Sequence, residues 1–352
     1  MSIRSRPNRV LLLMREELNR RRRAVVLGAI GLVGVAVVAA TPQLLGSKVA
    51  AALDDLHEAS APWLWLAGIL FVVAIVSWAF AWRAVVRACG GEVARADAAA
   101  RYAVGSGVNT FAPARLGDAV RVALFSAKLP NRERVWTSAG AYTTVGAARA
   151  AWVGVLLLCG FAFGGAPLWP LLIAIAFVSA AVGSALVARR RDPTSRAAHF
   201  FDAYRQFGRA PRQAAPVVAW MGAAMVARVG AAAAVAASLG VKESLAAALL
   251  IIPAVDVAGL VPLTPGNVGL TSGAVAIALQ THGVGLTDAL TVGIALHAVE
   301  AMCGLVVGAL GLLVLAGERR PVARHAAVAL GAATVMVAVA GALDLGLLAR
   351  IV

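Results

Sequence analysis

The sequence predicts an all-α protein that crosses a membrane several times, and three observations support this fold class. Hydrophobic residues make up 61% of the chain, and the mean hydropathy is +0.84. Charged residues make up only 14%, compared with about 25% in ordinary soluble domains. The charged residues are gathered in short segments between long apolar runs, which is the pattern of transmembrane helices joined by loops.

The net charge of +15 follows the same pattern. In a soluble protein this charge would suggest a nucleic-acid partner. Here the arginines lie in the short segments that flank the apolar runs, as the positive-inside rule describes for cytoplasmic loops. We therefore expect no nucleic-acid partner, and we place the N-terminus in the cytoplasm.

The chain divides into a short basic segment and one membrane domain. Residues 1–23 combine arginines with an apolar stripe and predict a cytoplasmic interfacial segment. Residues 24–348 form a single polytopic domain. About seven runs in it are long enough to cross the bilayer, near residues 24–45, 63–81, 135–163, 169–187, 215–239, 286–315 and 326–348. Their alternation leaves the C-terminus outside, and the aromatic, arginine-rich loop 189–212 is expected to lie along the cytoplasmic leaflet.

Two further apolar segments are too short for two crossings each. Residues 98–128 contain two short helical stretches separated by a proline, and both ends of the segment lie on the basic side. Residues 245–280 are broken in the same way, but the charges around them place both ends outside. We therefore predict two re-entrant or broken hairpins of opposite orientation. Broken helices of this kind often place a transporter site near the bilayer midplane.

The first hairpin contains the most polar part of the apolar domain. Its candidate binding residues are Asn109, Pro113, Arg115, Gly117, Asp118 and Arg121. Arg115, Asp118 and Arg121 are spaced by three, so a helix from residue 116 onward places them on one face. One guanidinium can pair with the aspartate, which leaves a second to bind an anion such as a phosphate. The alternative is an internal salt-bridge cluster without a ligand.

The second hairpin breaks at Pro265, Gly266, Asn267 and Gly269. Glycines allow close approach of a ligand to the backbone, and the free N–H groups at a helix start attract anions. A Pro-Gly break is also a common way to bend a membrane helix, so this motif supports a binding site only in combination with the first motif.

Five more ionisable residues lie inside the apolar segments: Arg149, Arg228, Asp256, His297 and Glu300. Unpaired charges in a bilayer are costly, so these groups are expected to pair with one another or to line and gate a hydrated cavity. His297 and Glu300 are one turn apart, but no third ligand is spaced for a metal, and the three cysteines are far apart. We predict neither a metal nor a cofactor, and no catalytic motif is present.

The two motifs together resemble the signature segments of the lysylphosphatidylglycerol synthase transmembrane-domain family, whose members are also described as flippase-like. The resemblance covers about residues 24–315 and rests on Asn-x-x-x-Pro-Ala-Arg-x-Gly-Asp-x-x-Arg at 109–121 and Pro-Gly-x-x-Gly at 265–269. Ser272 and Trp152 stand where the family often has acidic residues, which indicates a divergent branch. Full-length synthases append an aminoacyl-transferase domain, which we do not expect here because the sequence contains no soluble segment after the membrane part.

The resemblance implies that the protein moves an anionic lipid, either a phospholipid or a polyprenyl-phosphate-linked headgroup, across a bacterial cytoplasmic membrane. Two alternatives remain open at this point. One is a membrane-embedded enzyme that modifies a lipid headgroup, with Asp118, His297 or Glu300 as acid or base. The other is a scaffold for envelope biosynthesis that transports nothing and binds protein partners that the sequence does not identify.

Overall fold

The computed structural model is a helical bundle, and it describes residues 59–112, 116–130, 132–164, 199–259 and 268–316 together with a few isolated positions between 172 and 183. All regular secondary structure in these ranges is helical. The chain is therefore all-α over the described residues, as the sequence predicted. The predicted segment 1–23 and the predicted spans near 24–45 and 326–348 lie outside the described residues, as does nearly all of the span near 169–187.

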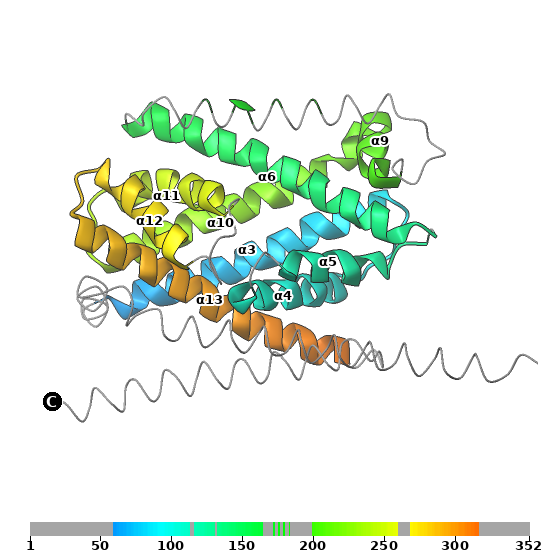
Figure 1. Ribbon diagram of the computed structural model, residues 1–352, viewed down its shortest axis with the longest axis horizontal. Coiled ribbons are helices and arrows are strands. Elements are labelled where there is room, and N and C mark those ends of the chain that lie inside the picture. The colour runs from blue at the N-terminus through cyan, green and yellow to red at the C-terminus, as the bar shows by residue number, and fades with distance from the viewer. Residues whose placement is uncertain are drawn as a thin grey trace, which may run out of the picture.

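Four long apolar helices run along the length of the bundle (Figure 1). They are α3 (Ala61–Ala88), α6 (Arg134–Gly164), α10 (Ala215–Ser238) and α13 (Leu286–Ala316). Each is long and apolar enough to cross a bilayer, which takes about 20 residues. They confirm the predicted spans near 63–81, 135–163, 215–239 and 286–315. The protein is therefore a multi-pass membrane protein.

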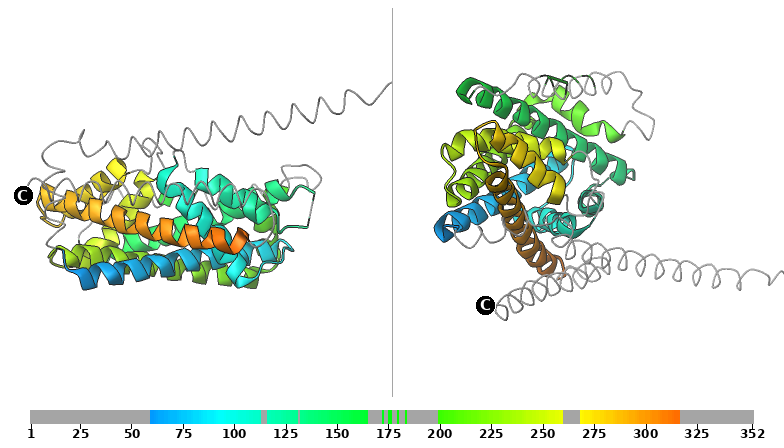
Figure 2. Two further views of the ribbon diagram at one scale, coloured as in Figure 1. Left: turned by 90° about the horizontal axis from the view of Figure 1, so that it is seen from below. Right: turned by 60° about the vertical axis from the view of Figure 1, so that its left-hand side comes forward.

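Two helical hairpins enter the bundle from opposite ends (Figure 1). The first consists of α4 (Arg95–Phe111) and α5 (Leu116–Ser126), and the second of α11 (Ser244–Ala258) and α12 (Val268–Gln280). Helix α4 begins about one turn earlier than the sequence suggested, with Asp97 in its first turn. At 1.5 Å per residue these helices are about 17–26 Å long, shorter than the ~30 Å core of a bilayer. Figure 2 shows α13 running from the end of the second hairpin towards the first.

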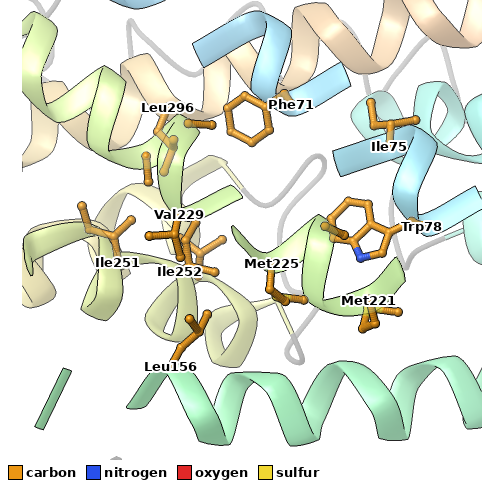
Figure 3. Close-up of a cluster of buried hydrophobic side chains, with 14 of the residues drawn as sticks. Phe71, Ile75, Trp78, Leu156, Met221, Met225, Val229, Ile251, Ile252 and Leu296 are labelled. Carbon is orange, nitrogen blue, oxygen red and sulfur yellow. The ribbon is translucent and has the colours of Figure 1, made fainter. Parts of the chain in front are cut away.

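The core forms where α3 packs along α10, with α11, α13 and α6 around them. Small side chains allow the close approach, because α10 contributes a run of fully buried alanines between Ala231 and Ala236. Larger apolar side chains fill the spaces between the helices. Those labelled in Figure 3 are Phe71, Ile75, Trp78, Leu156, Met221, Met225, Val229, Ile251, Ile252 and Leu296.

The two helices of the first hairpin cross at a pair of glycines. A Cβ atom on Gly117 would lie 2.0 Å from the backbone oxygen of Gly105, and one on Gly105 would lie 2.3 Å from the Cγ atom of Arg121. Real Cβ atoms essentially never show such distances. The role of Gly117 is therefore to let α5 lie directly on α4, which brings the side chains of Asn109 and Arg121 into the same layer.

The loop after the predicted span near 169–187 ends in the short helix α9 (Asp202–Arg209), followed by the 3-10 turn η3 (Pro211–Gln213). Helix α9 packs against α6 and α3, with Ala203 fully buried. The rings of Phe200 and Phe201 pack edge to face with a centroid distance of 5.1 Å. The Tyr204 ring lies tilted beside that of Phe201, with a centroid distance of 6.3 Å. The position of this helix along the cytoplasmic leaflet stays a prediction.

Candidate functional site: a polar cavity between the two hairpins

A cavity of about 210 Å³ lies between the tips of the two hairpins. The described elements from α3 to α13 all contribute to its wall except α9 and η3. Eight residues with a basic, carboxyl or amide side chain line it, in a bundle whose helices are mostly apolar: Asn109, Asp118, Arg121, Arg149, Arg228, Asp256, His297 and Glu300. The sequence singled out all eight from six different helices, and the fold brings them to one space.

Asp118 is the centre of the first polar cluster. Its Oδ1 atom accepts a hydrogen bond from the Asn109 amide at 3.0 Å and forms an ion pair with Arg121. Its Oδ2 atom accepts a hydrogen bond from the Tyr142 hydroxyl of α6 at 3.0 Å. The aspartate therefore joins both helices of the first hairpin to a transmembrane helix, and its charge is balanced by one arginine.

Arg121 uses all three guanidinium nitrogens on the protein. Besides Asp118, it donates to the Ser106 hydroxyl at 2.8 Å and to the Tyr102 carbonyl at 3.4 Å. The guanidinium also lies over the Tyr102 ring, 4.1 Å from its centroid. We predicted Arg121 as an anion ligand, and the geometry shows a side chain that is already held by the hairpin. Its contribution as a ligand stays a prediction.

Asp256 is the centre of the second cluster, and two arginines share it. Arg149 forms a fork on both carboxylate oxygens, with Nε–Oδ2 at 3.0 Å and Nη2–Oδ1 at 2.6 Å. Arg228 approaches Oδ1 with Nη1 at 2.5 Å. Two cations on one carboxylate leave a formal charge of +1. Because the side chain of Asp256 is only 7% exposed, this charge is poorly screened by solvent.

Two aromatic rings connect the clusters. Trp78 of α3 lies 5.2 Å from the Arg149 guanidinium and 5.3 Å from that of Arg228, measured from the ring centroid. Its centroid is 6.0 Å from that of Tyr102, and the Arg121 guanidinium lies over the Tyr102 ring. The cation–π contacts fix the guanidinium positions without using their N–H donors.

Several polar groups of the wall have no partner among the described residues. They include the buried Nε1 of Trp78, Nε of Arg228 and Oδ1 of Asn109. Arg149 is 34% exposed, and its Nη1 donates to no described residue. Glu300 and His297 likewise form neither an ion pair nor a hydrogen bond with the described part of the chain. Buried polar atoms without partners cost about 1–3 kcal/mol each; Trp78 Nε1 and Arg228 Nε are donors, whereas Asn109 Oδ1 is an acceptor, so the wall favours a polar occupant.

The other predicted binding residues do not line the cavity or lie outside the described ranges. Gly117 is buried against Gly105, as described above, and Gly269 is exposed in the first turn of α12 with open space around it. The residues outside the described ranges are Pro113, Arg115, Pro265, Gly266 and Asn267.

Sequence reasoning missed Trp78, Tyr102, Ser106 and Tyr142. Tyr102, Ser106 and Asn109 are spaced by four and three, so a polar stripe on α4 was a signal that could have found two of them. Trp78 had no such signal, because a tryptophan in an apolar run is usually a core residue or an interface anchor. Trp152, which replaces an acidic residue common in the resembled family, donates from Nε1 to the Val218 carbonyl at 3.0 Å.

Arg149 and Trp152 both lie on α6. The carboxylate that Arg149 binds is that of Asp256, on α11. The departure from the family pattern is therefore accompanied by an ion pair between α6 and the second hairpin. In the described residues no three His, Cys, Asp or Glu side chains gather in a metal-binding arrangement.

Long apolar helices, two opposed hairpins and a polar cavity between their tips define a polytopic membrane protein with a buried polar site. Residues 25–308 match the family described as Lysylphosphatidylglycerol synthase TM region, and the chain belongs to this family. The match covers both hairpins, the spans α3, α6 and α10 in full, and α13 as far as residue 308. A comparison with curated proteins finds no match.

Proposed function

We propose that the protein translocates an anionic lipid, with the phosphate of the headgroup held in the cavity between the hairpins. The observation that carries this proposal is the Arg149–Asp256–Arg228 cluster. It combines a formal charge of +1 with N–H donors that contact no described residue. Charge-assisted hydrogen bonds from guanidinium groups are the usual way in which proteins hold phosphates.

The size of the cavity suits a headgroup. Liquid water occupies about 30 Å³ per molecule, so about 210 Å³ corresponds to about seven waters. A phosphate with a small polar substituent fits this volume, whereas two acyl chains do not. We infer that the chains stay in the bilayer while the headgroup crosses between the hairpins.

The two hairpins supply a physical route for the headgroup. The described helices of both hairpins end near the middle of the bundle (Figure 1), and broken helices of this kind place transporter sites near the bilayer midplane. A rocking movement of one hairpin against the other would open the cavity to one side at a time.

The test is lipid transfer in proteoliposomes that contain the purified chain, with fluorescent lipids of anionic, zwitterionic and neutral headgroups. The diagnostic variant is Arg149→Gln, because the ion pair between Arg228 and Asp256 remains and the formal charge of the cluster changes from +1 to zero. Losing a hydrogen bond to a charged group costs about 1.5–3 kcal/mol, so anionic-lipid binding should fall roughly 10- to 100-fold.

The matched control is Arg205→Gln in α9, which removes an arginine that is paired with Asp202 and does not line the cavity. We expect the control to transfer lipid at the wild-type rate. Lipid recovered from the vesicles should be chemically unchanged, and a modified headgroup would favour the enzyme instead. Absence of transfer for every lipid by folded wild-type protein would refute translocation and favour the scaffold.

A further inference from the structure

We infer that Glu300 takes up one proton when an anion binds in the cavity, so that the protein carries an anionic headgroup together with a proton. The inference rests on the proposed function and specifies how the same site is balanced electrically. It comes from the charge count of the described wall and from the position of the one carboxylate in it that has no partner there.

The described wall has no net formal charge when Glu300 is ionised. Three arginines face three carboxylates: Arg121, Arg149 and Arg228 against Asp118, Asp256 and Glu300. Two of the carboxylates are held by arginines in direct ion pairs. Glu300 therefore supplies the charge that offsets the +1 of the second cluster, without contacting either arginine.

An anion that enters this space adds a negative charge in the cavity that Glu300 lines. A like charge nearby disfavours the ionised form of a carboxyl group. Asp118 and Asp256 cannot take up the proton easily, because doing so would break the direct ion pairs that hold the two clusters together. Glu300 has no such bonds to lose among the described residues.

The other ionisable groups around the cavity do not replace Glu300 in this role. Helix α12 has no ionisable side chain, and α3 contributes only Trp78 and apolar residues to the wall. The remaining groups are Tyr102 of α4, Asp118 and Arg121 of α5, Arg149 of α6, Arg228 of α10, Asp256 of α11 and His297 of α13. His297 lies one turn from Glu300 on the same helix, and Cys303 lies almost one turn beyond Glu300 on that helix.

The sign of the effect follows from the charge balance. An anion in the cavity favours the protonated form of Glu300, so lower pH strengthens anion binding. Over the range in which the empty protein keeps Glu300 ionised, uptake of one proton changes the dissociation constant tenfold per pH unit. The dependence disappears at pH values where Glu300 is already protonated in the empty protein.

The experiment is titration calorimetry on the full-length protein in detergent with dihexanoyl phosphatidylglycerol as the probe. This probe is a phosphodiester and keeps one negative charge from about pH 6 to pH 8, whereas a phosphomonoester has a second pKa of about 6 and would titrate itself. Measurements in two buffers of different ionisation enthalpy give the number of protons taken up. We expect one proton per lipid and a tenfold change in the dissociation constant per pH unit.

Two variants assign the proton. Glu300→Gln should bind the probe with no proton uptake and no pH dependence, at about the affinity that wild type reaches at low pH. His297→Asn should keep the tenfold slope, whatever its affinity. A slope that is lost in His297→Asn and kept in Glu300→Gln would overturn the assignment to Glu300.

The wild-type protein alone separates the two proposals, even if a variant fails to fold. Binding without proton uptake would refute the role of Glu300 and leave lipid translocation standing. No binding of the probe at any pH would remove both proposals.

Discussion

Replacing Asp256 by asparagine should destabilise the protein strongly, because Asp256 is the common partner of two arginines. The substitution keeps the size of the side chain and removes its charge, which leaves two guanidinium groups close together in a buried site. Removing one partner of a buried ion pair typically costs about 3–5 kcal/mol. We therefore expect Asp256→Asn to lower the free energy of unfolding by about 3–5 kcal/mol.

The exposure of the two arginines predicts how the loss can be repaired. The side chain of Arg149 is 34% exposed and can be hydrated again, whereas that of Arg228 is 3% exposed and cannot. Most of the cost therefore comes from Arg228. Adding Arg228→Met to Asp256→Asn should restore more stability than adding Arg149→Met.

The assay is equilibrium unfolding in detergent micelles, followed by tryptophan fluorescence. The control is Asp202→Asn at α9, where Asp202 pairs with Arg205 but is 26% exposed, so its loss should cost less than about 1 kcal/mol. The reasoning would be refuted if Asp256→Asn unfolded within about 1 kcal/mol of wild type, or if Arg149→Met repaired it better than Arg228→Met.

Two further predictions concern packing and thiol chemistry. Gly117→Ala should lower thermal stability by about 1–3 kcal/mol, because its Cβ would overlap the backbone of Gly105. The control is Gly146→Ala, which has open space around it and should be neutral or slightly stabilising in the same thermal scan. Burial and the Asp202 carboxylate raise the pKa of Cys89 to about 12, so the thiol stays protonated at neutral pH. In a variant whose only cysteine is Cys89, maleimide labelling should be slow at pH 7 and become faster as the pH approaches 12. Labelling should be immediate after unfolding in detergent. Fast labelling of the folded protein at pH 7 would contradict the raised pKa.

The sequence was informative wherever composition alone decides the structure. A run such as residues 63–81 has no stable alternative to a transmembrane helix, because lipid offers no hydrogen bonds to the backbone. The same cost argument identified Arg149, Arg228, Asp256, His297 and Glu300 as residues that must pair or face a cavity. The prolines at 113 and 265 marked the two hairpins for the related reason that proline lacks a backbone donor.

The sequence left the choice of partners open. Arg149 and Arg228 were both expected to pair with Asp256 or Glu300, and nothing in the spacing distinguished the four combinations. The fold places both arginines on Asp256 and leaves Glu300 without an ion pair among the described residues. This asymmetry gives the second cluster its charge and supports the proposed proton uptake.

Tertiary structure also changed the interpretation of the first motif. Arg115 and Arg121 were expected to share Asp118 and to leave one guanidinium for a ligand. Arg121 already donates to Ser106, Tyr102 and Asp118, whereas Arg115 lies outside the described residues, so that expectation stays a prediction. Gly117, predicted to contact a ligand, instead permits the close crossing of α4 and α5. Both outcomes depend on helices that lie side by side only in the folded hairpin.

The sequence by itself therefore determined the membrane class, four of the predicted spans, the two hairpins and the set of costly charges. Those features follow from local transfer energies, which depend on residue type and on neighbours along the chain. Only the tertiary structure decided which charges meet, that Trp78 lies beside both Arg149 and Arg228, and that a cavity remains between the hairpin tips. Those features depend on distances between helices that are far apart in sequence, which no pattern within a single helix records.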